Sequence, residues 1–139
     1  MKNLFKNFLK LLRYYLLKEQ REKNISAVLE DIIKKKQKKI INILDFGSGK
    51  NPIIAKFLIN KFKKKSIQIR IDCYDFYTKS ALRSLNSKNN LKFYNINEFY
   101  KNKKKYDFGL IIDVLHHVGI DNTKEISKII KNLKKKSET

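Results

Sequence analysis

Apolar residues recur along this chain in two patterns. Spacings of three or four positions, typical of one buried helix face, alternate with short isoleucine-rich runs, typical of buried strands. Helical spacing predicts helices over 2–18, from Asn24 or Ser26 through 33, after Pro52, after Thr78 and over 126–136. Strand patterns cover 40–44, 67–74, 91–95 and 106–113, with a polar turn at 86–90. Strands that alternate with helices in this way predict a parallel α/β sheet built from right-handed crossovers.

The strongest strand signal is Ile40–Leu44, and the residues that follow it form a distinctive turn. Asp45 interrupts the apolar run, and Gly47 and Gly49 place two of the four glycines in a three-residue window. At 51–52, an asparagine suits the N-cap of the next helix and a proline suits its first helical position. A strand, a glycine turn and a helix in this order predict a unit that binds a nucleotide-like ligand.

In a parallel sheet, ligands bind at the carboxyl ends of the strands. Gly47 and Gly49 lie at such an end and allow the backbone to approach a ligand closely. Asp75, which ends the second strand, is placed to accept hydrogen bonds from ribose hydroxyls, and Phe76 to lie against an adenine face. A carboxylate at Asp45 repels a pyrophosphate but attracts an ammonium or sulfonium group. This charge therefore favours a cationic cofactor over a dinucleotide.

The dinucleotide-binding fingerprint G-x-G-x-x-G is incomplete, because Pro52 occupies the place of its third glycine. The Asp-x-Gly-x-Gly pattern at 45–49, with an acid ending the second strand, resembles motifs I and II of the class I S-adenosylmethionine-dependent methyltransferases. Residues 106–112 and the Asp-Val-Leu-His-His-Val segment at 113–118 look like that family's fourth strand and the segment after it. The resemblance covers 40–133 in the family's order.

The resemblance implies a Rossmann-like parallel sheet of strand order 3-2-1-4 with flanking helices, preceded by N-terminal helices. Two domains are expected: amphipathic, basic helices over 1–38, and a methyltransferase-like cofactor-binding domain over 39–139. Members of the family continue after the last helix with further strands that close the sheet and help to hold the substrate. The sequence stops at Thr139, so we expect the second domain to be incomplete at its C-terminus.

The cofactor that the resemblance implies is S-adenosylmethionine, with binding residues at Asp45, Phe46, Gly47, Ser48, Gly49, Asp75, Phe76, Asn97 and Asp113. Asp45 and the two glycines match the family's positions around the methionine moiety of the cofactor. Asp75 matches the acid that holds the ribose hydroxyls, and Phe76 matches its neighbour at the adenine. Asn97 falls where the family often has an acid near the adenine amino group, so this contact is changed here. Asp113 matches the wall beside the methyl donor.

The implied reaction is an in-line methyl transfer from the sulfonium to a nucleophile on an unidentified acceptor, driven mainly by positioning. A base is needed only if the acceptor keeps its proton, and His116 or His117 could serve. Adjacent histidines point in different directions, so at most one faces the site, and a structural role is an equal alternative for each. Asp72 and Asp107 are interpreted as structural carboxylates. With one cysteine and no histidine pair four residues apart, we expect no metal site.

The formal net charge of +20 points to nucleic acid or an anionic membrane as partners. Only four of the 33 basic residues are arginines, whose forked guanidinium suits phosphate recognition, and an AT-biased gene would give the same excess of lysine. We therefore favour a compositional origin for most of the charge. The basic amphipathic helix at 2–18 could lie at a membrane surface, although packing on its own domain or on a partner protein is favoured.

Other features narrow the class of protein. The single Cys73 fits a reducing cytoplasm, and no apolar run approaches the roughly 18 residues of a spanning helix. The predicted function is a cytoplasmic S-adenosylmethionine-dependent methyltransferase. The alternatives are a non-catalytic or truncated fragment that binds the cofactor, an NAD-dependent or other nucleotide-binding enzyme, and a basic module for RNA or an anionic membrane. A steep loss of binding with salt would mark the basic module.

Overall fold

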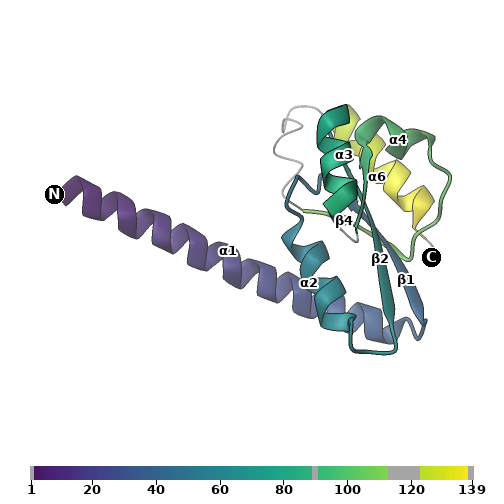
Figure 1. The fold of residues 1–139 in the computed structure, drawn as a ribbon, viewed down its shortest axis with the longest axis horizontal. Helices are drawn as coiled ribbons and strands as arrows, with labels where there is room; N and C mark the ends of the chain where they lie inside the picture. The colour runs from purple at the N-terminus through teal and green to yellow at the C-terminus, as the bar shows by residue number, and fades with distance from the viewer. Residues whose placement is uncertain (1, 89–90, 113–122, 138–139) are drawn as a thin grey trace. The chain divides into compact units, whose positions relative to one another are not determined.

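The computed structural model describes residues 2–88, 91–112 and 123–137 (Figure 1). The chain divides into two compact units, and the boundary between them in the sequence falls after Gln37. The first unit is a single helix, α1 (Lys2–Lys35). The prediction of two helices in this region is wrong. The polar residues between the two predicted helices are good helix formers and include no glycine or proline. Ion pairs between neighbouring turns, such as Lys23–Glu19 at 2.9 Å, support the continuous helix.

The apolar face predicted for the second half of α1 is only partly confirmed. Leu29 and Ile33 are buried, whereas Val28 is 60% exposed and Ile32 is 38% exposed. Just beyond the helix, Gln37 adopts a φ of +52°, the left-handed conformation that commonly ends a helix. None of the described helices combines the length and the apolar character that crossing a bilayer would require.

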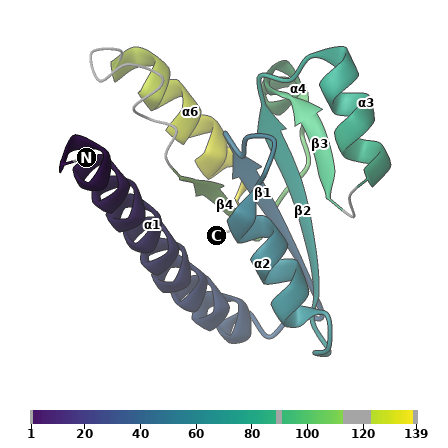
Figure 2. The ribbon, with the colours of Figure 1, turned by 60° about the vertical axis from the view of Figure 1, so that its left-hand side comes forward.

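The second unit is built on a four-stranded parallel sheet. Its strands are β1 (Ile40–Phe46), β2 (Gln68–Asp75), β3 (Lys92–Asn95) and β4 (Phe108–Ile111). They lie in the order β3-β2-β1-β4, and all three pairings are parallel (Figure 2). This confirms the α/β, Rossmann-like architecture and the predicted strand order 3-2-1-4.

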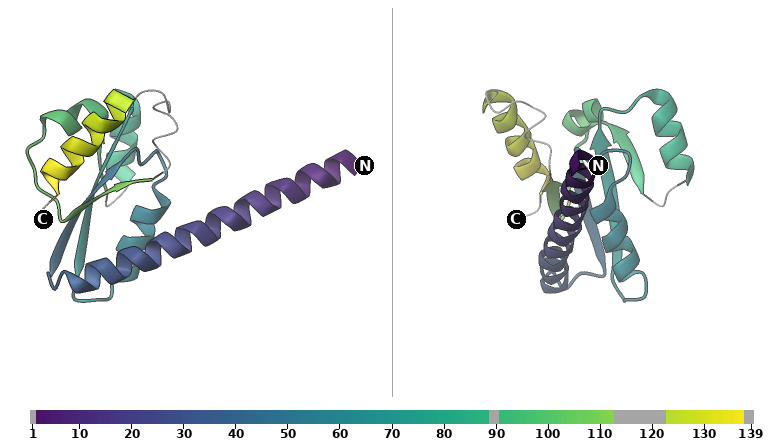
Figure 3. Two further views of the ribbon diagram at one scale, coloured as in Figure 1. Left: turned by 180° about the vertical axis from the view of Figure 1, so that it is seen from behind. Right: turned by 90° about the vertical axis from the view of Figure 1, so that its left-hand side faces the viewer.

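Helices cover both faces of this sheet (Figure 3). On one face lie α2 (Ile53–Phe62) and α3 (Lys79–Lys88), and on the other lie α4 (Ile96–Lys101) and α6 (Thr123–Lys136). The core beneath α4 and α6 consists of Leu44, Phe46, Tyr74, Ile96, Phe99, Tyr106 and Ile129. The residues of α2 that are buried are Ile54, Ala55, Leu58 and Phe62. Because side chains alternate between the faces of a strand, one sheet can supply both cores.

Two predicted helix ends are shifted. The cap of α2 is Pro52 and not Asn51, whose side chain instead accepts a hydrogen bond from Lys56 Nζ at 2.8 Å. The predicted turn at 86–90 is wrong for its first residues, because α3 continues to Lys88. Thr78 caps α3 as predicted, since its Oγ1 accepts a hydrogen bond from Ala81 N at 3.2 Å.

The short helix α4 is not among the elements that the sequence predicts. A reciprocal capping box starts it, in which the Asn95 side chain accepts from the N–H of Asn97, and Glu98 Oε1 accepts from Asn95 N. The strand β4 is shorter than the predicted 106–113. Asp113 lies outside the described residues.

Candidate cofactor site at the carboxyl ends of β1 and β2

The two central strands end side by side, and a glycine turn follows the first of them. Gly47 N donates a hydrogen bond to Tyr74 O at 2.7 Å, which continues the pairing of β1 and β2 beyond the last residue of β1. Gly47 has a φ of +73° and Gly49 a φ of +67°. Side chains rarely tolerate this conformation, so the local backbone explains why glycine stands at both positions.

Asp75 ties the end of β2 to this turn. Its Oδ2 accepts a hydrogen bond from Gly49 N at 2.7 Å, and its Oδ1 accepts one from Phe76 N at 2.7 Å. A carboxylate oxygen can accept more than one hydrogen bond, so both oxygens keep a lone pair for a ligand hydroxyl. The sequence suggested a contact between Asp75 and a ligand, but it gave no sign of this second contact with the turn.

Tyr77 is a residue of the site that sequence reasoning missed. Its side chain is buried, and its hydroxyl donates a hydrogen bond to Gly49 O at 2.5 Å. The same hydroxyl lies 2.9 Å from Ser48 Oγ, which can then act as the donor of this second hydrogen bond. Asn95 Nδ2 holds the Tyr77 backbone by donating to its carbonyl at 2.8 Å. The hydroxyl of Tyr77 therefore holds two residues of the turn, Ser48 and Gly49.

Replacing Tyr77 with phenylalanine should loosen the turn without emptying the core. We expect Tyr77→Phe to lower the free energy of unfolding by about 1–2 kcal/mol, because the partly buried Gly49 carbonyl and Ser48 hydroxyl lose a partner. Urea unfolding monitored by circular dichroism measures this change. Tyr94→Phe is the matched control, since no hydrogen bond of the Tyr94 hydroxyl is found within the described residues. An equal loss in both variants would contradict the assigned role.

Asp45 is the most unusual group at the site. Its side chain is only 7% exposed, and burial, with a smaller contribution from the charge of Asp75, raises its pKa from 3.8 to about 7. Neither a cation nor a hydrogen-bond donor is found at this carboxylate within residues 2–88, 91–112 and 123–137. A buried carboxylate without a cation is costly, so this position favours a ligand that carries positive charge.

The turn also leaves room for a ligand. A Cβ atom added at Gly49 would meet no atom within 4 Å, so the space beside its Cα is open in the described structure. The open space beside Gly49, the buried Asp45 and the remaining lone pairs of Asp75 are thus gathered around one turn. Together they can hold a ligand that is cationic at one end and carries hydroxyl groups at the other.

The remaining residues of the predicted site differ in how far their side chains are exposed. The Phe46 side chain is buried in the core, with its ring 4.7 Å from the ring of Phe99, so it could meet a cofactor only through its backbone. Phe76 is 84% exposed, and Asn97 lies exposed at the start of α4. Asp113, His116 and His117 fall outside the described residues.

Comparison with known proteins gives no family for this chain. No protein-family model matches the sequence, and no curated protein matches it. Among solved structures, the chain is similar to the X-ray structure of YjhP from E. coli, with a TM-score of 0.49 and 15% sequence identity. The similarity covers 86% of this chain and 45% of YjhP, so the chain spans less than half the length of that protein.

Proposed function

We propose that this chain binds S-adenosylmethionine at the carboxyl ends of β1 and β2 and transfers its methyl group to an acceptor. The observation that carries the proposal is Asp45, a buried acid for which the described part of the chain supplies no cation. S-adenosylmethionine supplies an electrophilic methyl group on a positively charged sulfonium. It also carries an ammonium group, so its methionine end matches the charge of this carboxylate.

Each of the other residues at the turn has a role in this proposal. Asp75 would accept hydrogen bonds from the ribose hydroxyls with the lone pairs that its backbone partners leave. Phe76, exposed beside it, would cover one face of the adenine. Gly49 would let the backbone come close to the ligand, since the space beside its Cα is open. Asp45 disfavours NAD, because a pyrophosphate next to this carboxylate would be repelled.

The chain would accelerate the transfer mainly by holding the reacting groups in line. The acceptor nucleophile would form a bond to the methyl carbon while the bond from carbon to sulfur breaks, and its electron pair stays on sulfur. If the acceptor carries a proton, a base must remove it, and His116 or His117 is the proposed group. The identity of the acceptor is left open by this proposal.

Calorimetric titration tests the binding part of the proposal. We expect saturable binding of S-adenosylmethionine by the wild-type chain and none of NAD. Asp75→Ala and Asp75→Asn should each weaken binding by about tenfold or more, since a charged hydrogen-bond acceptor is lost. Asp31→Ala is the matched control, because it removes an equal charge from an exposed ion pair with Lys35 on α1.

The outcomes separate the competing functions. Formation of S-adenosylhomocysteine with any of a panel of acceptors would distinguish an enzyme from a fragment that only binds the cofactor. No binding of S-adenosylmethionine by a folded sample would refute the proposal. Salt-sensitive binding of RNA or anionic vesicles in that case would favour the basic binding module instead.

A further inference from the structure

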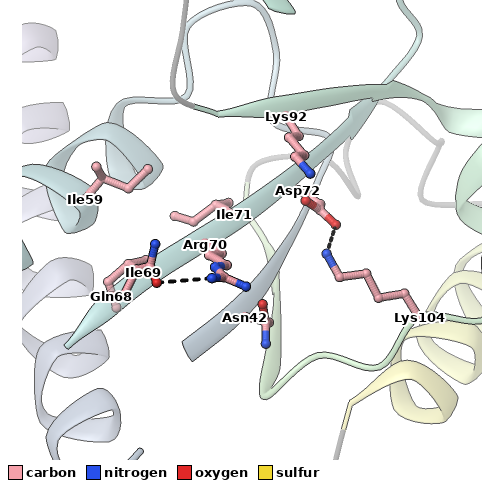
Figure 4. A pocket seen from close by; sticks show the side chains of 9 residues that line it. All are labelled: Asn42, Ile59, Gln68, Ile69, Arg70, Ile71, Asp72, Lys92 and Lys104. Carbon is pink, nitrogen blue, oxygen red and sulfur yellow. Dashed lines mark hydrogen bonds and ion pairs between the residues drawn. The ribbon is translucent and has the colours of Figure 1, made fainter. Parts of the chain in front are cut away.

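A cavity lies near the amino ends of the strands, away from the turn that follows β1. Its volume is about 660 Å³, and it is lined by Asn42, Ile59, Gln68, Ile69, Arg70, Ile71, Asp72, Lys92 and Lys104 (Figure 4). The cavity exists because the third strand, β3, is short. β3 first pairs with β2 at Asp72, so the segment Gln68–Ile71 has a strand partner in β1 only. The missing length of β3 leaves a hollow beside this segment.

The charges that line this cavity do not cancel. Asp72 Oδ2 is already neutralised, because it accepts hydrogen bonds from Lys104 Nζ at 2.6 Å and from the Tyr106 hydroxyl at 2.8 Å. Two further cations, Arg70 and Lys92, have no carboxylate partner within the described residues. The cavity thus carries two uncompensated positive charges, which a single dianionic group would balance.

Arg70 is oriented for such a group. Its Nη2 donates a hydrogen bond to Gln68 Oε1 at 3.2 Å, which holds the guanidinium and leaves its other N–H groups for a ligand. In Figure 4 the side chains of Arg70, Asn42 and Lys104 point into the same space beside Asp72. The Asn42 amide has no side-chain hydrogen bond within the described residues, so it adds a further donor.

The rest of the lining is apolar. Ile59 from α2 and Ile69 and Ile71 from β2 also line the cavity. They lie on the other side of β2 from Arg70 and Asp72, because side chains alternate along a strand (Figure 4). Pockets of this volume typically enclose a small molecule, and a few polar groups in them fix its orientation. The cavity therefore extends around the free edge of Gln68–Ile71, with its cations on one face of the sheet and its aliphatic side chains on the other.

We propose that this cavity binds a phosphate monoester whose remaining part is apolar or aromatic. A phosphate monoester carries a charge of about −1.5 to −2 at neutral pH, which matches the two uncompensated cations. The Arg70 fork would engage two phosphate oxygens, and Lys92 and Asn42 would engage the others. The apolar part would extend past the free edge of β2 toward Ile59, which is less buried than Ile69 and Ile71. The site is separate from the turn that holds Asp45 and does not depend on the proposed methyl transfer.

Phenyl phosphate is the probe, because it joins one phosphate to one aromatic ring. In a backbone NMR titration at about 150 mM salt, we expect saturable shifts of the Arg70 and Lys92 amides and little change at Gly49. Arg70→Gln should weaken the binding by about tenfold or more, and Lys92→Gln by several-fold. Inorganic phosphate should bind more weakly than phenyl phosphate, because it cannot use the isoleucine surface.

Two exposed positions control for the large net charge. Arg83→Gln and Lys64→Gln remove the same charges from surfaces outside the cavity, and we expect both variants to bind within about twofold of the wild type. An equal loss in Arg83→Gln and Arg70→Gln would overturn the proposal in favour of general attraction by a basic surface. Absence of saturable shifts around Arg70 would also overturn it. Saturating S-adenosylmethionine should leave the binding of phenyl phosphate unchanged, so this site and the cofactor site can fail separately.

Discussion

Asp45→Asn is expected to stabilise the ligand-free protein, and more so as the pH rises. The pKa of Asp45 is about 7 in the folded chain, compared with an ordinary value of 3.8. Between these values the unfolded chain releases a proton that the folded chain keeps, so wild-type stability falls as pH rises through this window and levels off above pH 7. At 1.36 kcal/mol per pKa unit, the loss amounts to roughly 4 kcal/mol. The asparagine variant cannot ionise and should not lose it.

Urea unfolding of the two proteins at pH 5, 6, 7 and 8 measures this effect directly. The variant should exceed the wild type by roughly 4 kcal/mol at pH 8 and by roughly 2 kcal/mol at pH 5. Other titrating groups act on both proteins and cancel in the difference. Asp31→Asn is the control, since that carboxylate lies exposed in a pair with Lys35. A difference that does not change with pH would contradict the raised pKa of Asp45.

The same substitution should have the opposite effect on binding. If the ligand is cationic, it favours the ionised form of Asp45, so the affinity of the wild type for S-adenosylmethionine should rise as pH approaches and passes 7. We expect Asp45→Asn to weaken binding by at least about tenfold at pH 8 and to remove this pH dependence. S-adenosylhomocysteine lacks the sulfonium charge and should show a smaller effect. A residue that destabilises the free protein but serves the ligand is typical of a functional site.

The sheet could be predicted because its signals are local and repeated. Each strand shows an isoleucine-rich or alternating run, and helices separate the strands, so connection rules leave few arrangements. The break predicted within α1 failed for a different reason. Asn24 and Ser26 are good capping residues, but without a glycine or proline nearby the chain can continue as helix through them. A capping residue marks a helix start only where something ends the previous helix.

The candidate site was predictable in its residue types but not in its internal bonds. The pattern at 45–49 indicated a ligand turn, and the structure places Asp45, Gly49 and Asp75 together there. The hydrogen bonds of Tyr77 with this turn join residues 28 or 29 positions apart, and no local pattern indicates such a pairing. The helix α4 did have a local signal, because Asn95 and Glu98 have the spacing of a capping box.

Asp107→Ala is expected to destabilise the protein by about 3 kcal/mol and to leave the cofactor site unaffected. The Asp107 carboxylate is buried, and its Oδ2 accepts a hydrogen bond from Asn42 N at 2.8 Å. Its Oδ1 pairs with Lys38 Nζ at 2.5 Å. Truncation leaves the Asn42 N–H without this acceptor, and a buried donor that loses its partner costs about 1–3 kcal/mol. The Lys38 side chain is 45% exposed and can be hydrated again, so its part of the loss is smaller.

Two further variants separate hydrogen bonding from charge at this position. Asp107→Asn keeps an oxygen for the Asn42 N–H, so we expect it to cost less than the alanine variant, about 1 kcal/mol. Lys38→Met removes the cation and leaves the carboxylate buried with fewer partners, which should lower the free energy of unfolding. Asp45 lies in β1 and Asp107 directly precedes β4, and both acids are buried. Removal of their charge should nevertheless change stability in opposite directions. The difference lies in the partners, and a stabilising effect of Asp107→Asn would contradict this account.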